Sequence, residues 1–507
     1  MPDFLLLSQD IITAARKLNI RQESMPIVFT FQNKNSTFTH ISITHHYQGA
    51  AMRKQFFVLL IIAGSVASQT VRINVPYEQF TLKNGLNVIL HVDKTTPTVS
   101  VNEWFHVGSG YEKKGRTGFA HLFEHIMFEG SKNVPEGKFD EWLEAAGGSN
   151  NGSTNVDRTI YFEDIPSNAL ELSLFLDSDR MGFLLDDMSQ GKLDGQRDVV
   201  KNERRQSYEN RPYGYAFLMI FESLYPQSHP YSWPTIGSMA DLSAASLEDV
   251  KEFFRTYYAP NNASLSIAGD IDVPKTKMMV EKWFNEVPMG KPVPQQDRSV
   301  AVLHEEKRMT IEDRVQLPRI YMAWHSPASL TPGDAELDLL ASVLAGGKNS
   351  RLYKKLVYDM QIAQDVSAFQ SSAKLGSQFI IISTARAGHT LAEIEQVIQE
   401  ELNQIKAQTP AARELERSRN QYEASFIERL ESINGKADML NNYYYLTGNP
   451  DYFNEDLARY YAIDPQDIST VATRYLKDDA RVVLSFVPKG KTELAAKNSP
   501  VVSTEGK

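Results

Sequence analysis

The 507-residue sequence contains no cysteine. This absence excludes disulfides, thiolate zinc sites and cysteine nucleophiles, so a metal here must be held by His, Asp or Glu. Histidine is also scarce, with 11 residues, which leaves few candidate ligands. The 53 Lys and Arg residues are outnumbered by 63 Asp and Glu residues, for a formal net charge of -10. The lack of a basic excess argues against a nucleic-acid partner.

No long apolar run predicts a membrane anchor. The stretch MRKQFFVLLIIAGSVASQ, which begins at Met52, has an apolar core of roughly 8–12 residues, whereas a spanning helix needs about 20. Its basic start, short apolar core and small residues Ser65 and Ala67 are typical of a secretory signal peptide over 52–67, cleaved after Ala67. A buried core strand is the alternative. The signal predicts an exported protein, periplasmic in a bacterium with an outer membrane, or secreted.

Residues 1–51 precede this signal, although export signals stand at the N-terminus. We therefore interpret 1–51 as a non-native extension and Met52 as the expected start of translation. The histidines of this stretch, His40, His45 and His46, are accordingly not assigned to a functional site.

The length predicts two or more domains, and 42% hydrophobic residues suffice for packed cores. Alternating patterns predict a hairpin over 77–93 with its turn at Asn84–Gly85, and strands over 98–109 and 159–166. Helical spacing appears in GRTGFAHLFEHIMFEGS (115–131), at 169–181 and at about 195–208, and GGSNNGSTNVDR (147–158) is predicted as a turn. This mixed order indicates an α+β fold.

The second half of the chain resembles the first. EDVKEFFRTYYAPNNASLSIAGD ends the first half and QDISTVATRYLKDDARVVLSFVPK ends the second, each with an amphipathic helix, a polar turn and an apolar strand. Aligning FEGSKN with LAGGKN sets the HLFEH segment opposite Leu337, Leu340 and Ala341. We therefore predict a catalytic domain over 72–290, a linker over 291–305, a non-catalytic copy over 306–490 and a flexible tail over 491–507.

The segment HLFEH carries the candidate chemistry. Residues at i, i+3 and i+4 of a helix share one face, so His121, Glu124 and His125 lie together. Two imidazoles one turn apart can chelate one zinc ion, and the neighbouring Glu can act as general base. The alternative is two ordinary histidines with Glu124 in an ion pair. The apolar residues around them favour the metal, because buried His and Glu need partners.

A third ligand must come from elsewhere, and Glu203 in RDVVKNERRQ is the best candidate. It follows Val199 and Val200 on the apolar face of its helix, where a carboxylate needs a cation. Helix geometry alone leaves two readings open: a metal ligand, or a salt bridge to Arg197 or Arg204.

HLFEH in its setting resembles the inverted zinc motif of the pitrilysin/insulinase family, the inverzincins. AGGSNNGSTNVDRTIYFEDIP, RDVVKNERRQ, HPYSWPTIGS, YYAPNNASLSIAGD and SRLYKKLVYDMQIAQDVSAF are similar to further family segments, in family order. The resemblance implies one Zn²⁺ per chain, with His121, His125 and Glu203 as ligands and Glu124 as base. It also implies two similar α/β-sandwich domains of the mitochondrial-processing-peptidase type.

The resemblance further implies that unfolded peptides bind as an added strand along GSNNGSTN, contacting Asn151, Gly152, Ser153 and Thr154. An Asx-rich turn is the alternative for these residues. Gln196 stands where many members have a Glu that supports the site from outside the ligand set.

Two other positions depart from the family pattern. Many members carry a substrate-binding Arg and Tyr after SRLY, where this chain has Val357 and Gln364. We therefore predict a second family subunit that supplies this pair, in a heterodimer or alternatively a homodimer.

The predicted function is that of a zinc endopeptidase acting on unfolded peptides or small proteins, with water activated by the metal. A catalytically silent assembly subunit is the main rival, although such relatives usually lose a ligand or the base. A small-molecule zinc hydrolase would need a compact pocket instead of a chamber between the repeats.

Overall fold

The computed structural model describes residues 72–296 and 300–504, together with the backbone of the antiparallel hairpin β1 (Ile27–Gln32) and β2 (Phe38–Ile43). The chain divides into two units, Met1–Thr70 and Val71–Lys507. The predicted signal peptide over 52–67 lies outside the described residues. All that follows concerns the second unit.

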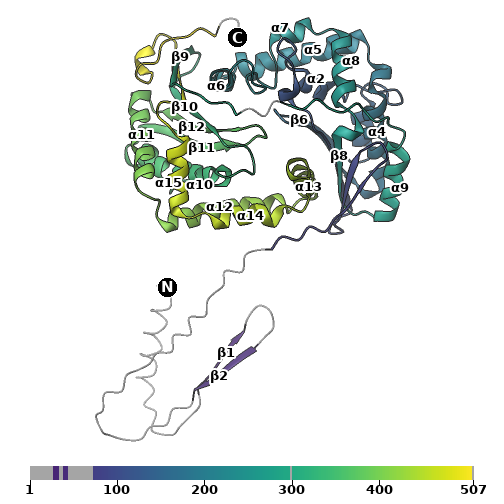
Figure 1. The fold of residues 1–507 in the computed structure, drawn as a ribbon, viewed down its shortest axis with the longest axis horizontal. Helices are drawn as coiled ribbons and strands as arrows, with labels where there is room; N and C mark the ends of the chain where they lie inside the picture. The colour runs from purple at the N-terminus through teal and green to yellow at the C-terminus, as the bar shows by residue number, and fades with distance from the viewer. Residues whose placement is uncertain (1–26, 33–37, 44–71, 297–299, 505–507) are drawn as a thin grey trace. The chain divides into compact units, whose positions relative to one another are not determined.

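The first half contains one mixed six-stranded sheet with helices (Figure 1). Its elements are β3 (Glu78–Thr81), β4 (Asn87–Val92), β5 (Thr98–Phe105), η1 (Ser109–Tyr111), α2 (Phe119–Ile126), α3 (Lys138–Ala145), β6 (Ser149–Thr154), β7 (Thr159–Pro166), η2 (Ser167–Ala169), α4 (Leu170–Asp187), α5 (Gln190–Arg204), η3 (Arg205–Glu209), α6 (Ala216–Leu224), α7 (Met239–Ala244), α8 (Leu247–Tyr257), η4 (Pro260–Asn262), β8 (Ala263–Gly269) and α9 (Val273–Phe284).

The second half contains a five-stranded mixed sheet with its own helices. Its elements are β9 (Lys307–Asp313), β10 (Arg319–Ser326), α10 (Asp334–Ala345), η5 (Tyr353–Asp359), β11 (Ala363–Ser371), β12 (Ser377–Ala385), α11 (Leu391–Ala407), α12 (Ala412–Arg429), α13 (Ile433–Thr447), α14 (Phe453–Ala462), α15 (Pro465–Tyr475), β13 (Val482–Pro488) and η6 (Thr492–Leu494).

The two sheets repeat one topology. The strand order β4-β8-β5-β7-β6 of the first half matches β9-β13-β10-β12-β11 of the second. In both, the last strand of the half pairs in parallel with the first strand of the series and antiparallel with the next, β5 or β10. The predicted α+β fold with two similar domains is confirmed.

The local predictions agree with the strands and helices except at one segment. The hairpin turn at Asn84–Gly85 forms with a left-handed Gly85, at φ 91°, and the helix of HLFEH is α2. The segment 149–154, predicted as part of a turn, is instead strand β6, paired with β7 along its length. Its Asn, Gly and Ser residues have low strand propensity, but pairing with the buried β7 overrides that preference.

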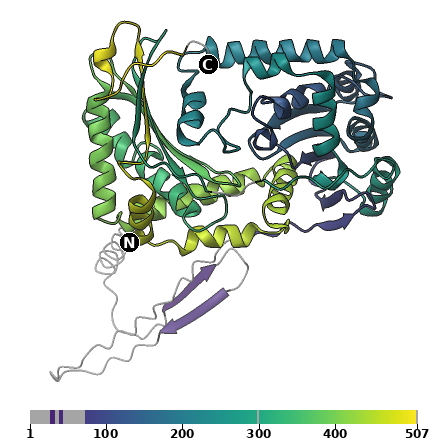
Figure 2. The ribbon, with the colours of Figure 1, turned by 45° about the horizontal axis from the view of Figure 1, so that its top comes forward.

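Each half lends a helix to the sheet of the other. Helix α13 packs across β4, β5 and β8 of the first sheet, and α6 packs on β10 and β13 of the second (Figures 1 and 2). Alternate residues of β5 point to opposite faces. Val99 and Val101 join the core with α2, whereas the backbone oxygen and side chain of Asn102 accept hydrogen bonds from Asn441 on α13. The face that α13 covers is therefore partly polar.

One charged residue lies deep in the first half. The Arg180 guanidinium on α4 is fully buried and pairs with the carboxylates of Glu103, Glu163 and Asp177. Burial, and then the neighbouring carboxylates, raise the pKa of Glu103 and Glu163 well above the ordinary value, although the Arg180 guanidinium acts in the opposite direction. This cluster joins β5, β7 and α4.

The predicted flexible tail is partly docked. Thr310 of β9 forms backbone hydrogen bonds with Pro500 and Val502, and Ala496 is buried. The docking has a simple cause: β9 is the edge strand of its sheet and offers unpaired backbone groups.

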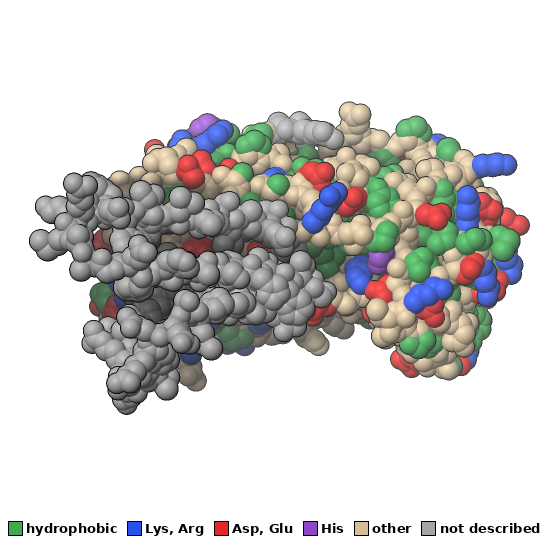
Figure 3. Space-filling view, turned by 90° about the horizontal axis from the view of Figure 1, so that it is seen from below, with side chains coloured by type: hydrophobic (Ala, Val, Ile, Leu, Met, Phe, Trp, Pro, Cys, Tyr) green, Lys and Arg blue, Asp and Glu red, His purple; other side chains and the backbone are tan. Residues whose placement is uncertain are grey.

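Figure 3 shows how charged and apolar side chains are distributed over one face of the described surface. Acidic, basic and apolar side chains are interspersed over the part of this face that described residues form, without a continuous basic stripe. No described helix combines the length and the apolar character that crossing a membrane requires.

Candidate metal centre

Helix α2 is held in place at its first turn. It begins after Gly118, whose φ of 90° suits glycine and whose Cβ position would lie 2.9 Å from the Ile236 carbonyl oxygen. The buried Glu112 carboxylate accepts hydrogen bonds from the N–H groups of Gly118 (2.9 Å) and Ala120 (2.8 Å). Glu112, which precedes the helix, thus provides the cap that Gly118 at the N-cap position cannot provide.

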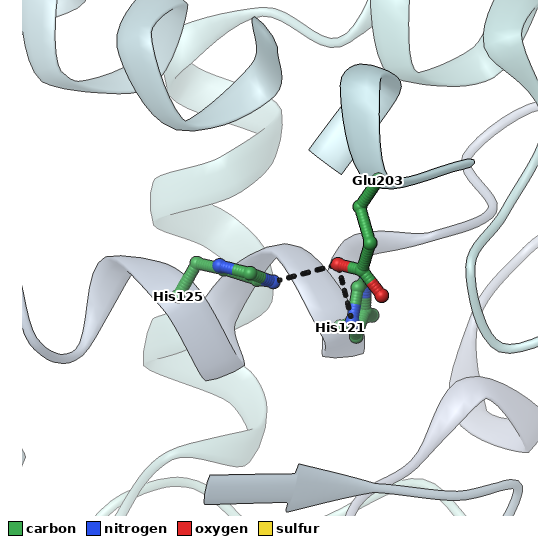
Figure 4. A group of neighbouring side chains, drawn as sticks. All are labelled: His121, His125 and Glu203. Carbon is green, nitrogen blue, oxygen red and sulfur yellow. Dashed lines mark ion pairs between the residues drawn. The ribbon is translucent and has the colours of Figure 1, made fainter. Parts of the chain in front are cut away.

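The two histidines and Glu203 converge, as Figure 4 shows. Nε2 of His121 lies 3.5 Å and Nε2 of His125 lies 3.3 Å from Oε2 of Glu203. Neither Arg197 nor Arg204 pairs with Glu203. Arg197 donates to the Asp194 carboxylate and to a backbone oxygen. Arg204 donates to the backbone oxygen of Gly237 and forms an ion pair with Glu209. The salt-bridge alternative for Glu203 is therefore not observed.

The three side chains fit a zinc ion. Their ligand atoms all lie within 4.8 Å of one another, and they are the one such group of His, Asp and Glu found among the described residues. Two imidazoles and one carboxylate form a donor set of catalytic zinc, with a fourth position left open. The Nδ1 atom of His121 is buried and has no hydrogen-bond partner within the described part of the chain.

The electrostatics agree with this fit. Burial lowers the pKa of His121, although the carboxylates of Glu203 and Glu124 act in the opposite direction. The hydrogen bond with His125 lowers the pKa of Glu203, against the effect of burial. Neutral imidazole and charged carboxylate are the forms that bind a cation.

A pocket of about 240 Å³ adjoins two of the three ligands, His121 and Glu203. It is lined by His121, Glu124, Gly152, Ser153, Thr154, Glu203, Tyr208, Thr235 and Ile236. The backbone of β6 passes close to the candidate base, since a Cβ on Gly152 would lie 3.0 Å from Cγ of Glu124. β6 is the edge strand of its sheet, paired only with β7 among the described strands.

The predicted substrate-binding residues do not all reach this pocket. Gly152, Ser153 and Thr154 line it, whereas Asn151 accepts a hydrogen bond from the N–H of Gly152 and does not. The Asx-rich turn is excluded over 149–154, because these residues form a strand. Their contact with substrate stays a prediction.

Sequence reasoning missed Tyr208, Thr235 and Ile236. Thr235 and Ile236 belong to HPYSWPTIGS, which resembles a family segment, but nothing in its sequence places it at the pocket. Tyr208 lies in η3, a π-helical turn that continues α5. Burial, and then the charge of Glu203, raise the pKa of Tyr208, so its hydroxyl keeps its proton near neutral pH. A π-turn leaves no periodic signal in a sequence.

Three further predicted positions lie outside the pocket. Gln196 is half-buried on α5, and its side chain forms no hydrogen bond with a described residue. Val357 is buried in η5, and Gln364 is exposed on β11, the edge strand of the second sheet. The supporting role of Gln196 stays a prediction.

The second half has no counterpart of the metal ligands. Leu337, Leu340 and Ala341 on α10 are buried in its apolar core. Apolar core residues in the second half thus stand where the first half has its metal-binding histidines and Glu124.

Two family models match adjacent parts of the chain. The model described as insulinase (peptidase family M16) matches residues 87–228, and that described as the peptidase M16 inactive domain matches residues 244–422. The chain is 29% identical to the zinc protease PqqE of Helicobacter pylori over 446 residues, covering 85% of this chain and 97% of that protein. It is 24% identical to the uncharacterized zinc protease YmxG of Bacillus subtilis, covering 80% and 97%.

Solved structures show the same fold. The crystal structure of a protease from Helicobacter pylori has a TM-score of 0.77 at 28% identity, covering 82% of this chain and all of that one. A peptidase M16 inactive domain structure from Pseudomonas fluorescens has a TM-score of 0.74 at 17% identity, covering 83% and 99%.

Proposed function

The chain belongs to the insulinase (M16) family of peptidases, and from this premise we propose that it is a zinc-dependent endopeptidase for unfolded peptides or small proteins. One observation carries the proposal: two histidines on α2 and a carboxylate on α5 converge beside an open sheet edge, with Glu124 in the same pocket. The relatives' names as zinc proteases support it.

His121, His125 and Glu203 would hold the zinc ion. When bound there, zinc would lower the pKa of a water molecule and polarise the scissile carbonyl. Glu124, one helical turn from His121 and adjacent to His125, takes the proton from the attacking water and returns it to the leaving amine. Ordering of α2 by Glu112 keeps these side chains in register.

The substrate would bind in extended form. The free edge of β6 offers backbone groups to an added peptide strand, the mode in which main-chain hydrogen bonds provide affinity and side-chain pockets provide selectivity. Gly152 permits this approach, because any larger residue would contact Glu124. Asn151, Ser153 and Thr154 complete the proposed strand contact.

A partner subunit is part of the proposal. Val357 and Gln364 cannot provide the Arg and Tyr that the family pattern has at these positions, and a second family subunit would supply them, in a heterodimer or a homodimer. Sedimentation and peptide hydrolysis measured together over a range of concentrations test this idea. Full activity in a monomer would disprove it.

Export is also proposed, on the signal-like segment 52–67. Expression with residues 1–67 intact, followed by N-terminal sequencing of the exported product, should give a chain that starts after Ala67. A mature protein that still begins near Met1 would rule out both the signal and the start at Met52.

The decisive experiment compares Glu203→Gln and Glu124→Gln with wild type and with Asp198→Asn, an exposed control on α5. We expect about one zinc ion per chain in all but Glu203→Gln, and hydrolysis of a quenched peptide in wild type and the control only. Activity that persists without metal would refute the proposal. Metal-loaded wild type that cleaves no peptide, alone or with a family subunit, would favour the silent assembly subunit.

A further inference from the structure

Tyr208 enters the metal pocket from the segment that follows α5. Helix α5 ends at Arg204, and the wider turn η3 then carries Tyr208 into the pocket that Glu203 also lines. π-turns within helices occur frequently at functional sites. The Tyr208 ring packs against the core of the first half.

Tyr208 lines the pocket together with Glu203. Burial, and then the charge of Glu203, raise the pKa of the Tyr208 hydroxyl, which therefore keeps its proton. It forms no hydrogen bond with any residue of the described chain. A phenol held in place without an acceptor can donate to a ligand.

The other hydroxyls that line the pocket either have a contact already or are shut off from solvent. Ser153 Oγ accepts a hydrogen bond from Arg158 at 3.2 Å and keeps its own O–H, and Thr235 Oγ1 lies 3.4 Å from Ser109 Oγ, where either oxygen could be the donor. Thr154 Oγ1 has no partner within the described residues, but it is shut off from solvent and hence from a ligand in the pocket. Among these hydroxyls, that of the half-buried Tyr208 combines access to the pocket with the absence of any partner within the described residues.

We propose that Tyr208 is a catalytic residue that donates a hydrogen bond to the scissile carbonyl oxygen as that oxygen becomes negative. The inference rests on the proposed peptidase function. Water adds to the carbonyl carbon, its proton passes to Glu124, and the C–N bond breaks as Glu124 protonates the amine. Tyr208 forms no covalent bond and keeps its proton throughout. A donor already aimed at the developing charge stabilises the transition state more than the substrate.

The test compares Tyr208→Phe with wild type and with Tyr215→Phe, a control on a nearby half-buried tyrosine outside the pocket. Removing one such donor lowers kcat by about 10²–10³-fold, and we expect that loss with KM changed by less than about twofold. Zinc content and zinc affinity should stay at the wild-type level. A phosphinic peptide, which mimics the tetrahedral carbon, should bind the Phe variant about 10²-fold more weakly. An uncleaved peptide should bind equally in a Glu124→Gln background.

Three results would overturn the assignment. Unchanged kcat and phosphinic-peptide affinity would make Tyr208 a packing residue. Loss of zinc from Tyr208→Phe would make it a positioning residue for Glu203. Equal weakening of the phosphinic peptide and the uncleaved peptide would mean uniform binding and no selective contact with the transition state. If wild type binds zinc but cleaves nothing, the proposed function fails, and the phosphinic-peptide comparison still decides the role of Tyr208.

Discussion

Removal of the Glu112 carboxylate tests how far the metal site depends on the start of α2. In Glu112→Ala, the N–H groups of Gly118 and Ala120 lose their acceptors in a buried setting. Each unsatisfied group costs about 1–3 kcal/mol, or about 2–6 kcal/mol together. At roughly 2–4 °C per kcal/mol, the first half should lose roughly 5–20 °C in Tm.

The same change should weaken zinc binding. His121 lies in the first turn of α2, so fraying of that turn releases its imidazole, and loss of an orienting contact typically lowers metal affinity by about 10–100-fold. Thermal unfolding with and without chelator, and calorimetric zinc titration, measure both effects beside Glu144→Ala, an exposed control on α3. Unchanged Tm and zinc affinity would refute the reasoning.

The difference in stability between wild type and Glu112→Ala should also depend on pH. Burial raises the pKa of Glu112 to about 8. A raised pKa in the folded state means that the protonated form is the one stabilised, so the advantage of wild type over Glu112→Ala is greatest below about pH 4.5 and shrinks as pH rises through about 8. A gap in Tm that widened with pH would contradict this sign.

Three other outcomes follow from contacts described above. Burial, and then nearby Lys374, lower the pKa of His106 to about 3, so neutral His106 stabilises the fold above about pH 6.5. Acidification from pH 7 to 5 should cost wild type roughly 1–2 kcal/mol more than His106→Gln in denaturant unfolding, and equal losses would contradict the assignment. Arg180→Met should lower the free energy of unfolding by about 3–5 kcal/mol, because it leaves buried carboxylates without compensation; a change below 1 kcal/mol would mean that they become protonated at little cost. Gly152→Ala should lower kcat about 10-fold with little change in Tm, since the new Cβ crowds Glu124, and unchanged kcat would show that β6 yields freely.

The parts of the fold and of the site that depend on local sequence pattern could be predicted. The spacing of His121, Glu124 and His125 sufficed to place them on one helical face, and the repeat sufficed to predict two similar domains. Leu337 and Leu340 lie on α10, which follows β10 as α2 follows β5, and both are buried in the apolar core of the second half.

Long-range contacts were beyond such reasoning. Whether Glu203 meets the histidines or an arginine depends on how α5 packs on α2, and helix geometry alone left this open. β6 was mistaken for a turn because its strand character comes from β7 and not from its own residues. Tyr208 was missed because a single π-turn shifts the helical register without any change in composition.

The exchange of helices between the halves has a consequence for biosynthesis. All strands of the first sheet have been translated once β8 ends at Gly269. Helix α13, which covers one face of this sheet, begins only at Ile433. At about 5–20 residues per second, a nascent chain would wait roughly 10–30 s for that helix to be translated. Polar groups such as Asn102 on this face can bind water in the interval, which limits the aggregation risk that an exposed apolar surface would bring during synthesis.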